Sequence, residues 1–318
     1  MIVLKVLAEL GWEVSVDKLK PHDVLFEALG VLFDLASLST KGSIVVSNTV
    51  KRKISIDRDI CETLTSGYLA ADDAATLRGR MQFGEAQHWG RVLSITARQL
   101  SLRATGHGSG LVTGDLLESL LIARWLINNA KPRTIQPWLE EPCNLIFVDA
   151  AADSIEMTSS QKLGVGGALF SHRLLLPRHF GFRLQQDIVD HWQSTGSQQV
   201  IGQAELLPIL IAKRAWKYEL SYSRNLWFID NESARESIIR SYSPIWTSRE
   251  ILVQIKIEDM KASSVDWYAR VPTNANWGDG PSRLEFADVE ALGSVEQVVA
   301  PLSLAKLTGV NVLELLAQ

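Results

Sequence analysis

The sequence has little cysteine and no long apolar run. Only Cys61 and Cys143 occur among 318 residues, and neither belongs to a CxxC pair or a Cys/His cluster. Neither a disulfide framework nor a zinc site is supported, so a reducing compartment is the simple expectation. No stretch of about 18 apolar residues is present, and the N-terminus lacks the layout of a secretory signal. We therefore expect a soluble intracellular protein, cytoplasmic or nuclear, with no membrane partner.

Neither sign of charge is in large excess over the whole chain, but the basic residues are unevenly distributed. The formal net charge is −4, and 46% hydrophobic and 21% charged residues are ordinary for a soluble globular protein. The segment 78–103 carries a single acid, Glu85, and five arginines: Arg78, Arg80, Arg91, Arg98 and Arg103. Such an excess could follow a nucleic-acid phosphate backbone or could be a solvated helix face, and the sequence leaves both open.

The first 141 residues contain mostly helical patterns. The chain is long enough for two domains, each with its own core. We expect a helix at Val3–Leu10, a strand at Trp12–Val16 and, at Leu25–Leu35 around Gly30, either a hairpin or a strand in close backbone contact. Four further helices are predicted at Ile56–Ser66, Ala70–Phe83, Ala86–Leu102 and Thr113–Asn128. The first of them has a predicted start at Asp57 and a predicted end at Gly67. Pro132, Pro137 and Pro142 indicate a linker, which places the main boundary near residue 140.

The patterns after residue 140 alternate between strands and helices. Strands are predicted at Leu145–Asp149, Gly164–Ser171, Arg173–Leu184, Leu226–Ile229 and Val265–Val271. Helices are predicted at 202–217, from Glu232, at Ser248–Met260 and after Asp279. This order indicates a mixed five-stranded sheet with helices on both faces, an α+β or α/β fold. No role can be assigned to the final 30 residues.

Four acids occupy positions where a fold could bring them together. Asp149 follows an apolar run, Glu205 begins a helix, Asp230 follows another apolar strand, and Asp279 precedes a Gly-Pro pair. Each has an ordinary structural interpretation: a turn residue, a first-turn helix acid, or an N-cap. Asp153 competes with Asp149 for the same role, but the apolar run ends directly at Asp149.

Converging carboxylates raise each other's pKa unless a cation lies among them. Mg²⁺ prefers oxygen ligands, and two such ions about 4 Å apart can bind both the attacking water and the leaving oxygen of a phosphodiester. The four acids therefore predict a metal-dependent nuclease.

Other motifs give weaker or no support for a functional site. The glycines of GVGGALF at 164–170 lack dinucleotide-loop spacing and predict a strand that allows another backbone to approach closely. Asp72 and Asp73 lie among helix formers and predict a helix start. His172, His179 and His191 have no metal-ligand spacing.

Four segments resemble the acidic motifs of the ribonuclease H domain of retroelement reverse transcriptases. They are FVDAA at 147–151, QAELLPIL at 203–210, FIDNESA at 228–234 and NANWGDGPSR at 274–283, which ends in a D-x-x-SR pattern. Upstream, LGWEVSVDKLKP at 10–21 and FEALGVLFDL at 26–35 resemble the end of a reverse transcriptase palm, and 56–103 resembles its helical thumb. The resemblance is closest to the long-terminal-repeat and tyrosine-recombinase groups.

The resemblance implies four regions: a palm end at 1–48, a thumb or connection with linker at 49–141, a ribonuclease H-like domain at 142–286 and an extension at 287–318. It implies that Asp149, Glu205, Asp230 and Asp279 bind two Mg²⁺ ions, with Mn²⁺ as a substitute. The RNA strand of an RNA–DNA hybrid would be cut, the thumb arginines would bind the duplex backbone, and the rest of the polyprotein would be a partner.

Two departures from the family pattern matter. The Asp-Asp motif of the polymerase site lies before residue 1 or is absent, so no polymerase activity is expected from this chain. Many cellular relatives also have a histidine shortly before the fourth acid, and VPTNANWGD at 271–279 has none, which would slow product release or metal turnover.

Two other functions compete with the nuclease. A catalytically inactive or domesticated retroelement fragment that binds nucleic acid fits the missing palm, whereas the presence of all four acids favours the nuclease. A transposase or integrase usually carries its glutamate last of three acids, and here Glu205 comes second.

Overall fold

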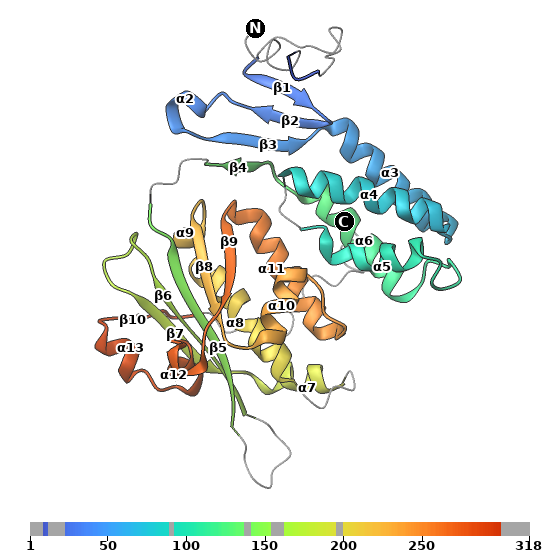
Figure 1. Cartoon of the computed structure of the whole chain (residues 1–318). Coiled ribbons are helices and arrows are strands. Elements are labelled where there is room, and N and C mark those ends of the chain that lie inside the picture. Colours follow the sequence, from blue (N-terminus) through green and yellow to red (C-terminus); the bar gives the residue numbers. More distant parts are fainter. Residues whose placement is uncertain are drawn as a thin grey trace.

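The computed structural model describes residues 9–11, 23–88, 92–136, 141–153, 162–194 and 200–299. A small sheet with four long helices precedes a larger sheet with its own helices (Figure 1). The predicted helix at Val3–Leu10 and strand at Trp12–Val16 lie almost wholly outside the described residues. Within the described part, none of the helices combines the length and apolar character needed to cross a bilayer.

The small sheet is antiparallel, and its four strands follow in chain order. They are β1 (Leu25–Ala28), β2 (Val31–Asp34), β3 (Ile44–Asn48) and β4 (Arg133–Ile135), with a short helix α2 (Leu38–Lys41) before β3. The predicted hairpin is confirmed: Leu29 and Gly30 both have positive φ, 53° and 73°, as a two-residue turn between twisted strands requires. β3 and β4 were not predicted. Residues 133–135, expected in a linker, instead pair with Ile44 to Val46, because an open strand edge binds a short extended segment from far along the chain.

Four helices separate β3 from β4. They are α3 (Val50–Ser66), α4 (Ala71–His88), α5 (Ser94–Ala104) and α6 (Gly114–Asn129). The predicted start of the first helix near Asp57 was wrong, because Thr49 caps it: the Thr49 hydroxyl accepts a hydrogen bond from the Arg52 N–H at 3.3 Å. Its predicted end is confirmed at Gly67, which has φ 66°.

The larger sheet is mixed, with strand order β10-β7-β6-β5-β8-β9. Its strands are β5 (Asn144–Asp153), β6 (Lys162–Phe170), β7 (Arg178–Arg183), β8 (Arg224–Ile229), β9 (Val265–Arg270) and β10 (Val295–Glu296). β6 is antiparallel to both of its neighbours, β5 and β7, whereas β8 and β9 run parallel to β5. The five predicted strands are confirmed, although β7 begins at Arg178 rather than Arg173. A sixth strand, β10, comes from the extension to which no role was assigned.

Helices cover both faces of this sheet, as predicted. They are α7 (Gln186–Ser194), α8 (Ile201–Ala215), α9 (Lys217–Leu220), α10 (Glu232–Arg240), α11 (Trp246–Ala262), the 3₁₀ helix η2 (Thr273–Ala275), α12 (Asp279–Arg283) and α13 (Ala287–Ala291). Alternate residues of β6 divide between the faces. Leu163 and Val165 pack with α8 in the larger core, whereas Ala168 belongs to a second cluster with Phe286 and Val289 beside α13.

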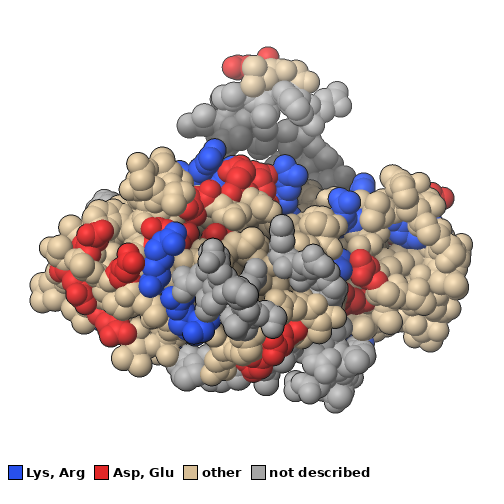
Figure 2. Space-filling view, turned by 90° about the horizontal axis from the view of Figure 1, so that it is seen from below, with Lys and Arg blue, Asp and Glu red and all other residues tan. Residues whose placement is uncertain are grey.

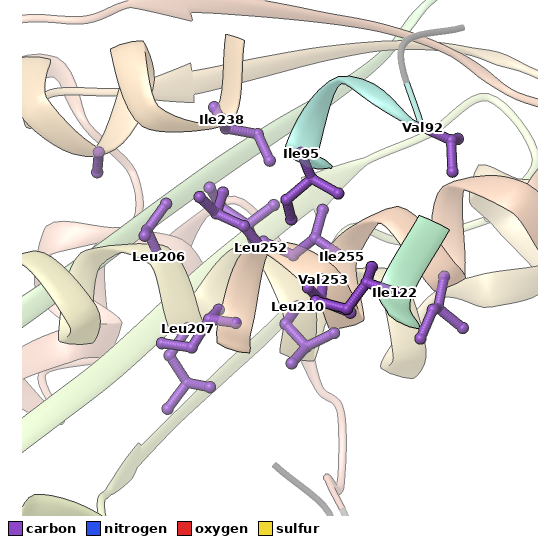
Figure 3. Packing of buried hydrophobic residues seen from close by; sticks show 14 of the residues in the cluster. Val92, Ile95, Ile122, Leu206, Leu207, Leu210, Ile238, Leu252, Val253 and Ile255 are labelled. Carbon is purple, nitrogen blue, oxygen red and sulfur yellow. The ribbon is translucent and has the colours of Figure 1, made fainter. Parts of the chain in front are cut away.

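The larger core continues across the predicted boundary near residue 140. Val92, Ile95 and Ile122 of the N-terminal part belong to the same cluster as Leu210 of α8 and Val253 of α11 (Figure 3). An ion pair between Arg249 Nη1 and Asp115 Oδ2, 2.9 Å apart, joins α11 to α6 as well. Buried apolar residues of both parts therefore share the larger cluster, although the domain division itself stays a prediction.

Candidate metal centre formed by three carboxylates

Three of the four predicted acids come together at one point of the larger sheet. Asp149 lies on β5, Glu205 on α8, and Asp230 directly after β8. One carboxylate oxygen from each lies within 4.8 Å of the others. Residues separated by dozens of positions in the sequence therefore share one site.

Strand register explains why Asp149 and Asp230 meet. β5 runs on to Asp153, beyond the predicted strand end at Asp149, but β8 pairs with it only as far as Phe147 opposite Phe228. Continuing this register places Asp230 beside Asp149, where β8 leaves the sheet. The side chain of Asp153, the competing acid, lies outside the described residues.

Burial makes the ionised forms of these acids costly. Asp149 is 4% exposed and Glu205 is 6% exposed. Burial, and then the nearby charges of Asp149 and Asp230, raise the pKa of Glu205 to about 9. Burial is also the main cause that raises the pKa of Asp149 to about 7; the Ser282 hydroxyl opposes it, while Asp230 and Asp279 add to it. At neutral pH the site is short of positive charge.

The oxygen atoms of this group fit a hard divalent cation. Glu205 accepts hydrogen bonds from the side chain of Asn231 and from the Ala150 N–H, but its buried Oε2 has no partner. Asp230 Oδ1 is likewise buried without a partner. Among the residues that the structure describes, no Lys, Arg or His forms an ion pair with any of the three acids. Unpaired carboxylate oxygens converging on one point are the ligands that Mg²⁺ and Mn²⁺ take.

Helix α12 packs closely against β6 and β7 because glycines occupy the contact positions on these strands. A Cβ atom on Gly164 or Gly166 of β6 would lie 2.0 Å from Ser282 O or 2.2 Å from Ser282 N. On β7, a Cβ atom on Gly181 would lie 2.2 Å from Pro281 O. The predicted use of the β6 glycines for close backbone approach is therefore confirmed, and the backbone that approaches is that of α12.

The loop before α12 is attached to β5 at the site itself. Asn276 Nδ2 donates to Val148 O at 3.1 Å, and the Gly278 N–H donates to Asn276 Oδ1 at 3.1 Å. Ser282 Oγ then donates to Asp149 Oδ2 at 2.7 Å. This attachment holds α12 against Asp149.

Asp279 begins α12 but does not join the group of three. Its carboxylate pairs with Arg283, one turn on, with Arg283 Nη2 and Asp279 Oδ1 3.0 Å apart. Its charge nevertheless contributes to the raised pKa of Asp149. The fourth predicted ligand therefore lies beside the centre and holds a different partner.

The five predicted arginines lie in or between α4 and α5, and most already have partners within the chain. Arg80 pairs with Asp59, Arg78 Nη1 donates to Ser101 Oγ at 3.3 Å, and Arg103 Nε donates to Leu69 O at 2.6 Å. Arg98 is exposed, with its guanidinium 4.4 Å from the Tyr242 ring centre. Arg91 lies outside the described residues. Their role in nucleic-acid binding stays a prediction.

Acidic and basic side chains are intermingled over part of the surface. On the face seen from below in Figure 2, Lys and Arg lie beside Asp and Glu rather than in separate areas of one sign. The prediction that Asp72 and Asp73 mark a helix start is confirmed, because both lie in the first turn of α4.

Two residues that contact the centre were not singled out from the sequence. Ser282 lies in the D-x-x-SR pattern, and Asn231 follows Asp230 in FIDNESA. Asn231 also caps α10, because its Oδ1 accepts a hydrogen bond from the Ala234 N–H at 3.0 Å. Both are small polar residues close in sequence to a predicted metal ligand, and this position was the only sequence feature that could have pointed to them.

No family model matches the sequence, and no curated protein matches it either. Two solved structures cover 46% of this chain. RNase H1 from the halophilic archaeon Halobacterium salinarum has 13% sequence identity, 99% of its own chain covered and a TM-score of 0.33. The N-terminal RNase H domain of a Mycobacterium tuberculosis protein, fused to maltose-binding protein, has 12% identity, 96% of its chain covered and a TM-score of 0.32.

Proposed function

We propose that this chain is a metal-dependent ribonuclease that cuts the RNA strand of RNA–DNA hybrids. The observation that carries the proposal is the convergence of Asp149, Glu205 and Asp230, with one oxygen of each within 4.8 Å of the others and no internal cation among the described residues. A buried cluster with raised pKa values costs stability, and such a cost is typical of functional sites.

Asp149, Glu205 and Asp230 would hold divalent cations, two in the full site, with Mg²⁺ as the expected ion and Mn²⁺ as a substitute. When bound, these ions would acidify a water molecule and stabilise the leaving 3′ oxygen of a phosphodiester. The protein's own contribution is geometric: Ser282 fixes the Asp149 carboxylate, and Asn231 fixes that of Glu205.

Asp279 is the proposed fourth ligand. It begins a helix whose Ser282 contacts Asp149, so a change of its side-chain conformation would bring its carboxylate toward the group. Arg283 would then be released from the ion pair that it makes with Asp279.

We further propose that the chain comes from a retroelement reverse transcriptase. The support is the resemblance of the four acidic motifs and of residues 10–35 and 56–103 to that family. On this proposal Arg78, Arg80, Arg91, Arg98 and Arg103 contribute to duplex binding, with exposed Arg98 the most available. The rest of the polyprotein would supply the polymerase site.

Cleavage of a labelled RNA–DNA hybrid by the full chain tests this proposal. With Mg²⁺ we expect cleavage of the RNA strand alone, and single-stranded RNA and double-stranded DNA should stay intact. Asp149→Asn should lower the rate by at least about a thousandfold, because it removes a charged ligand of the metal. The matched control is Asp288→Asn, which changes an exposed acid of α13 and should leave the rate unchanged.

Two results would contradict the proposal. One is the absence of cleavage by folded protein with either Mg²⁺ or Mn²⁺. The other is cleavage that Asp149→Asn leaves intact.

A further inference from the structure

A cavity unrelated to the carboxylate centre lies along the free edge of the larger sheet. Its volume is about 440 Å³, within the range of small-molecule sites. Residues of β9, α10, α11 and the segment 131–133, which leads into β4, line it, so both parts of the chain contribute to it. It lies at the beginning of β9, whereas Asp230 follows the end of the parallel strand β8. The cavity and the centre are therefore at opposite ends of these strands.

The cavity has an apolar and aromatic wall. Ile238 and Ile239 come from α10, Met260 from α11, and Tyr268 from β9. Trp267 also lines it and is 71% exposed, an unusual position for so large an apolar side chain. Because successive side chains of a strand point to opposite faces, the indole of Trp267 lies on the other side of β9 from Tyr268. Its exposed face offers a flat ring a surface on which to stack.

The acids that line the cavity are already neutralised. Lys213 Nζ lies 2.8 Å from Asp259 Oδ1 and 2.6 Å from Asp266 Oδ2, and it is buried behind them. Lys256 Nζ lies 3.2 Å from Asp259 Oδ2. These four charges sum to zero, so they add no net attraction for a cation.

Two cations at the cavity have no acidic partner. Arg133 Nη2 donates to the Ser264 carbonyl at 3.2 Å, and Lys131 is exposed. Within the described ranges of the chain, neither forms an ion pair with a carboxylate. The half-buried guanidinium of Arg235, which also lines the cavity, is paired with Glu232 at 2.7 Å. Lys131 and Arg133 therefore leave the cavity with an excess of positive charge suited to an anion.

The strand edge adds backbone donors. The N–H groups of Val265 and Val271 donate toward β8, to Ser223 O and Ile229 O. Because backbone groups alternate along a strand, the N–H groups of Asp266 and Tyr268 point to the opposite, open side. The cavity thus combines an exposed indole, two cations without an acidic partner among the described residues, and backbone amides that point away from β8.

We propose that this cavity binds a nucleoside monophosphate, with the phosphate at Lys131 and Arg133 and the base against Trp267. The aromatic wall accounts for the base, and the unpaired cations account for the phosphate. This site is independent of the proposed nuclease, since it shares no residue with the carboxylate centre.

Titration calorimetry of the full chain with AMP in EDTA tests the proposal, because EDTA removes divalent metals and with them any contribution of the carboxylate centre. We expect saturable binding with a dissociation constant of about 0.1–1 mM. Adenosine and inorganic phosphate, given separately, should each bind at least about tenfold more weakly, since each lacks one of the two contacts.

Variants locate the site. Lys131→Ala combined with Arg133→Ala, and separately Trp267→Ala, should each weaken AMP binding about tenfold or more. Lys131→Ala alone changes one exposed side chain and serves if the double variant fails to fold. Arg240→Ala, which removes a 73% exposed arginine side chain of α10 outside the cavity, should leave binding unchanged.

Three results would overturn the proposal. The first is the absence of saturation below about 10 mM AMP. The second is binding that neither the cation variants nor Trp267→Ala affect. The third is phosphate or adenosine binding as tightly as AMP.

Discussion

Helix α8 takes part in two buried acidic clusters that differ in one component. Near its start, Glu205 meets Asp149 and Asp230; two turns later, Lys213 meets Asp259 and Asp266. Both clusters contain two aspartates from other elements of the larger sheet and its helices. Among the residues that the structure describes, only the second contains a cation of the chain itself.

The pKa values reflect this difference. Burial alone would raise the pKa of Asp259, but the charges of Lys213 and Lys256 outweigh burial and lower it. Glu205 has no such partner, and its pKa rises to about 9. The Lys213 cluster is thus a structural ion network, whereas the Asp149 cluster is an arrangement that a divalent cation would complete.

Removing the internal cation should have the largest effect. Lys213→Met would leave buried Asp266 without a counter-charge and Asp259 with that of Lys256 alone, and it should lower the free energy of unfolding by about 3–5 kcal/mol. Urea unfolding followed by circular dichroism measures it. The control is Lys261→Met, whose ammonium pairs with Glu258 at 3.1 Å with 58% of its side chain exposed.

The control should change stability by less than about 1 kcal/mol. Equal effects of the two substitutions would mean that Lys213 does not stabilise the buried carboxylates of Asp259 and Asp266.

Neutralising an acid of the other cluster should have the opposite sign. In metal-free protein at pH 8, Glu205→Gln should raise the free energy of unfolding by about 1.4 kcal/mol or more, the equivalent of one pKa unit. Glu62→Gln, in an exposed glutamate of α3 with 71% of its side chain exposed, should have almost no effect. A loss of stability in Glu205→Gln would show that the carboxylate is satisfied as it stands.

The same pKa shift sets a pH dependence. The folded pKa of Glu205, about 9, exceeds the ordinary value of 4.5, so the folded state holds a proton that the unfolded state releases. Stability from this group is full below about pH 4.5 and is lost as the pH rises toward 9. Wild-type protein in EDTA should therefore lose more stability between pH 5 and pH 8 than Glu205→Gln does, and parallel pH profiles would contradict this.

Divalent cations should restore the stability that the protein loses as the pH rises. At pH 8, Mg²⁺ at about ten times its dissociation constant should raise the melting temperature by about 2–4 °C, and by less at pH 5, where the acids are protonated. NaCl at matched ionic strength controls for screening. An equal shift in Asp149→Asn would place the ion elsewhere.

The smallest effect should come from the one hydroxyl that supports the unpaired cluster. Ser282→Ala removes the 2.7 Å hydrogen bond to Asp149 and should lower the free energy of unfolding by about 1 kcal/mol. Ser66→Ala, at an exposed helix end, should change it by less than about 0.5 kcal/mol. No difference between the two would mean that Ser282 does not hold the Asp149 carboxylate.

Much of the larger sheet could be predicted from the sequence, because its strands are apolar runs that end at acids or turns. LIFVD and LWFID were both correctly predicted as strands of the sheet. The start of α3, after Asn48 and Thr49, was predicted incorrectly. β3 ends at Asn48 and α3 begins two residues later, yet the cap at Thr49 was overlooked in favour of Asp57. Local patterns give an element's type better than its boundaries.

The pairing of strands that are far apart in the chain could not be predicted from the sequence. β4 is three residues long and becomes a strand only because β3 offers its edge, and β10 pairs with β7 for the same reason. The acids Asp149, Glu205 and Asp230 could be named from their positions after strands and on a helix. That Asp279 holds Arg283 instead of joining them depends on side-chain conformation, which no motif specifies.

Calorimetric titration of the metal-free full chain with Mn²⁺ at pH 8 tests the central claim most directly. Wild-type protein should bind Mn²⁺ saturably, and binding should be lost in Asp149→Asn and in Glu205→Gln but kept in Asp288→Asn. Absence of saturable binding in the wild-type protein, or binding that survives both substitutions, would contradict the account of Asp149, Glu205 and Asp230 as a metal centre.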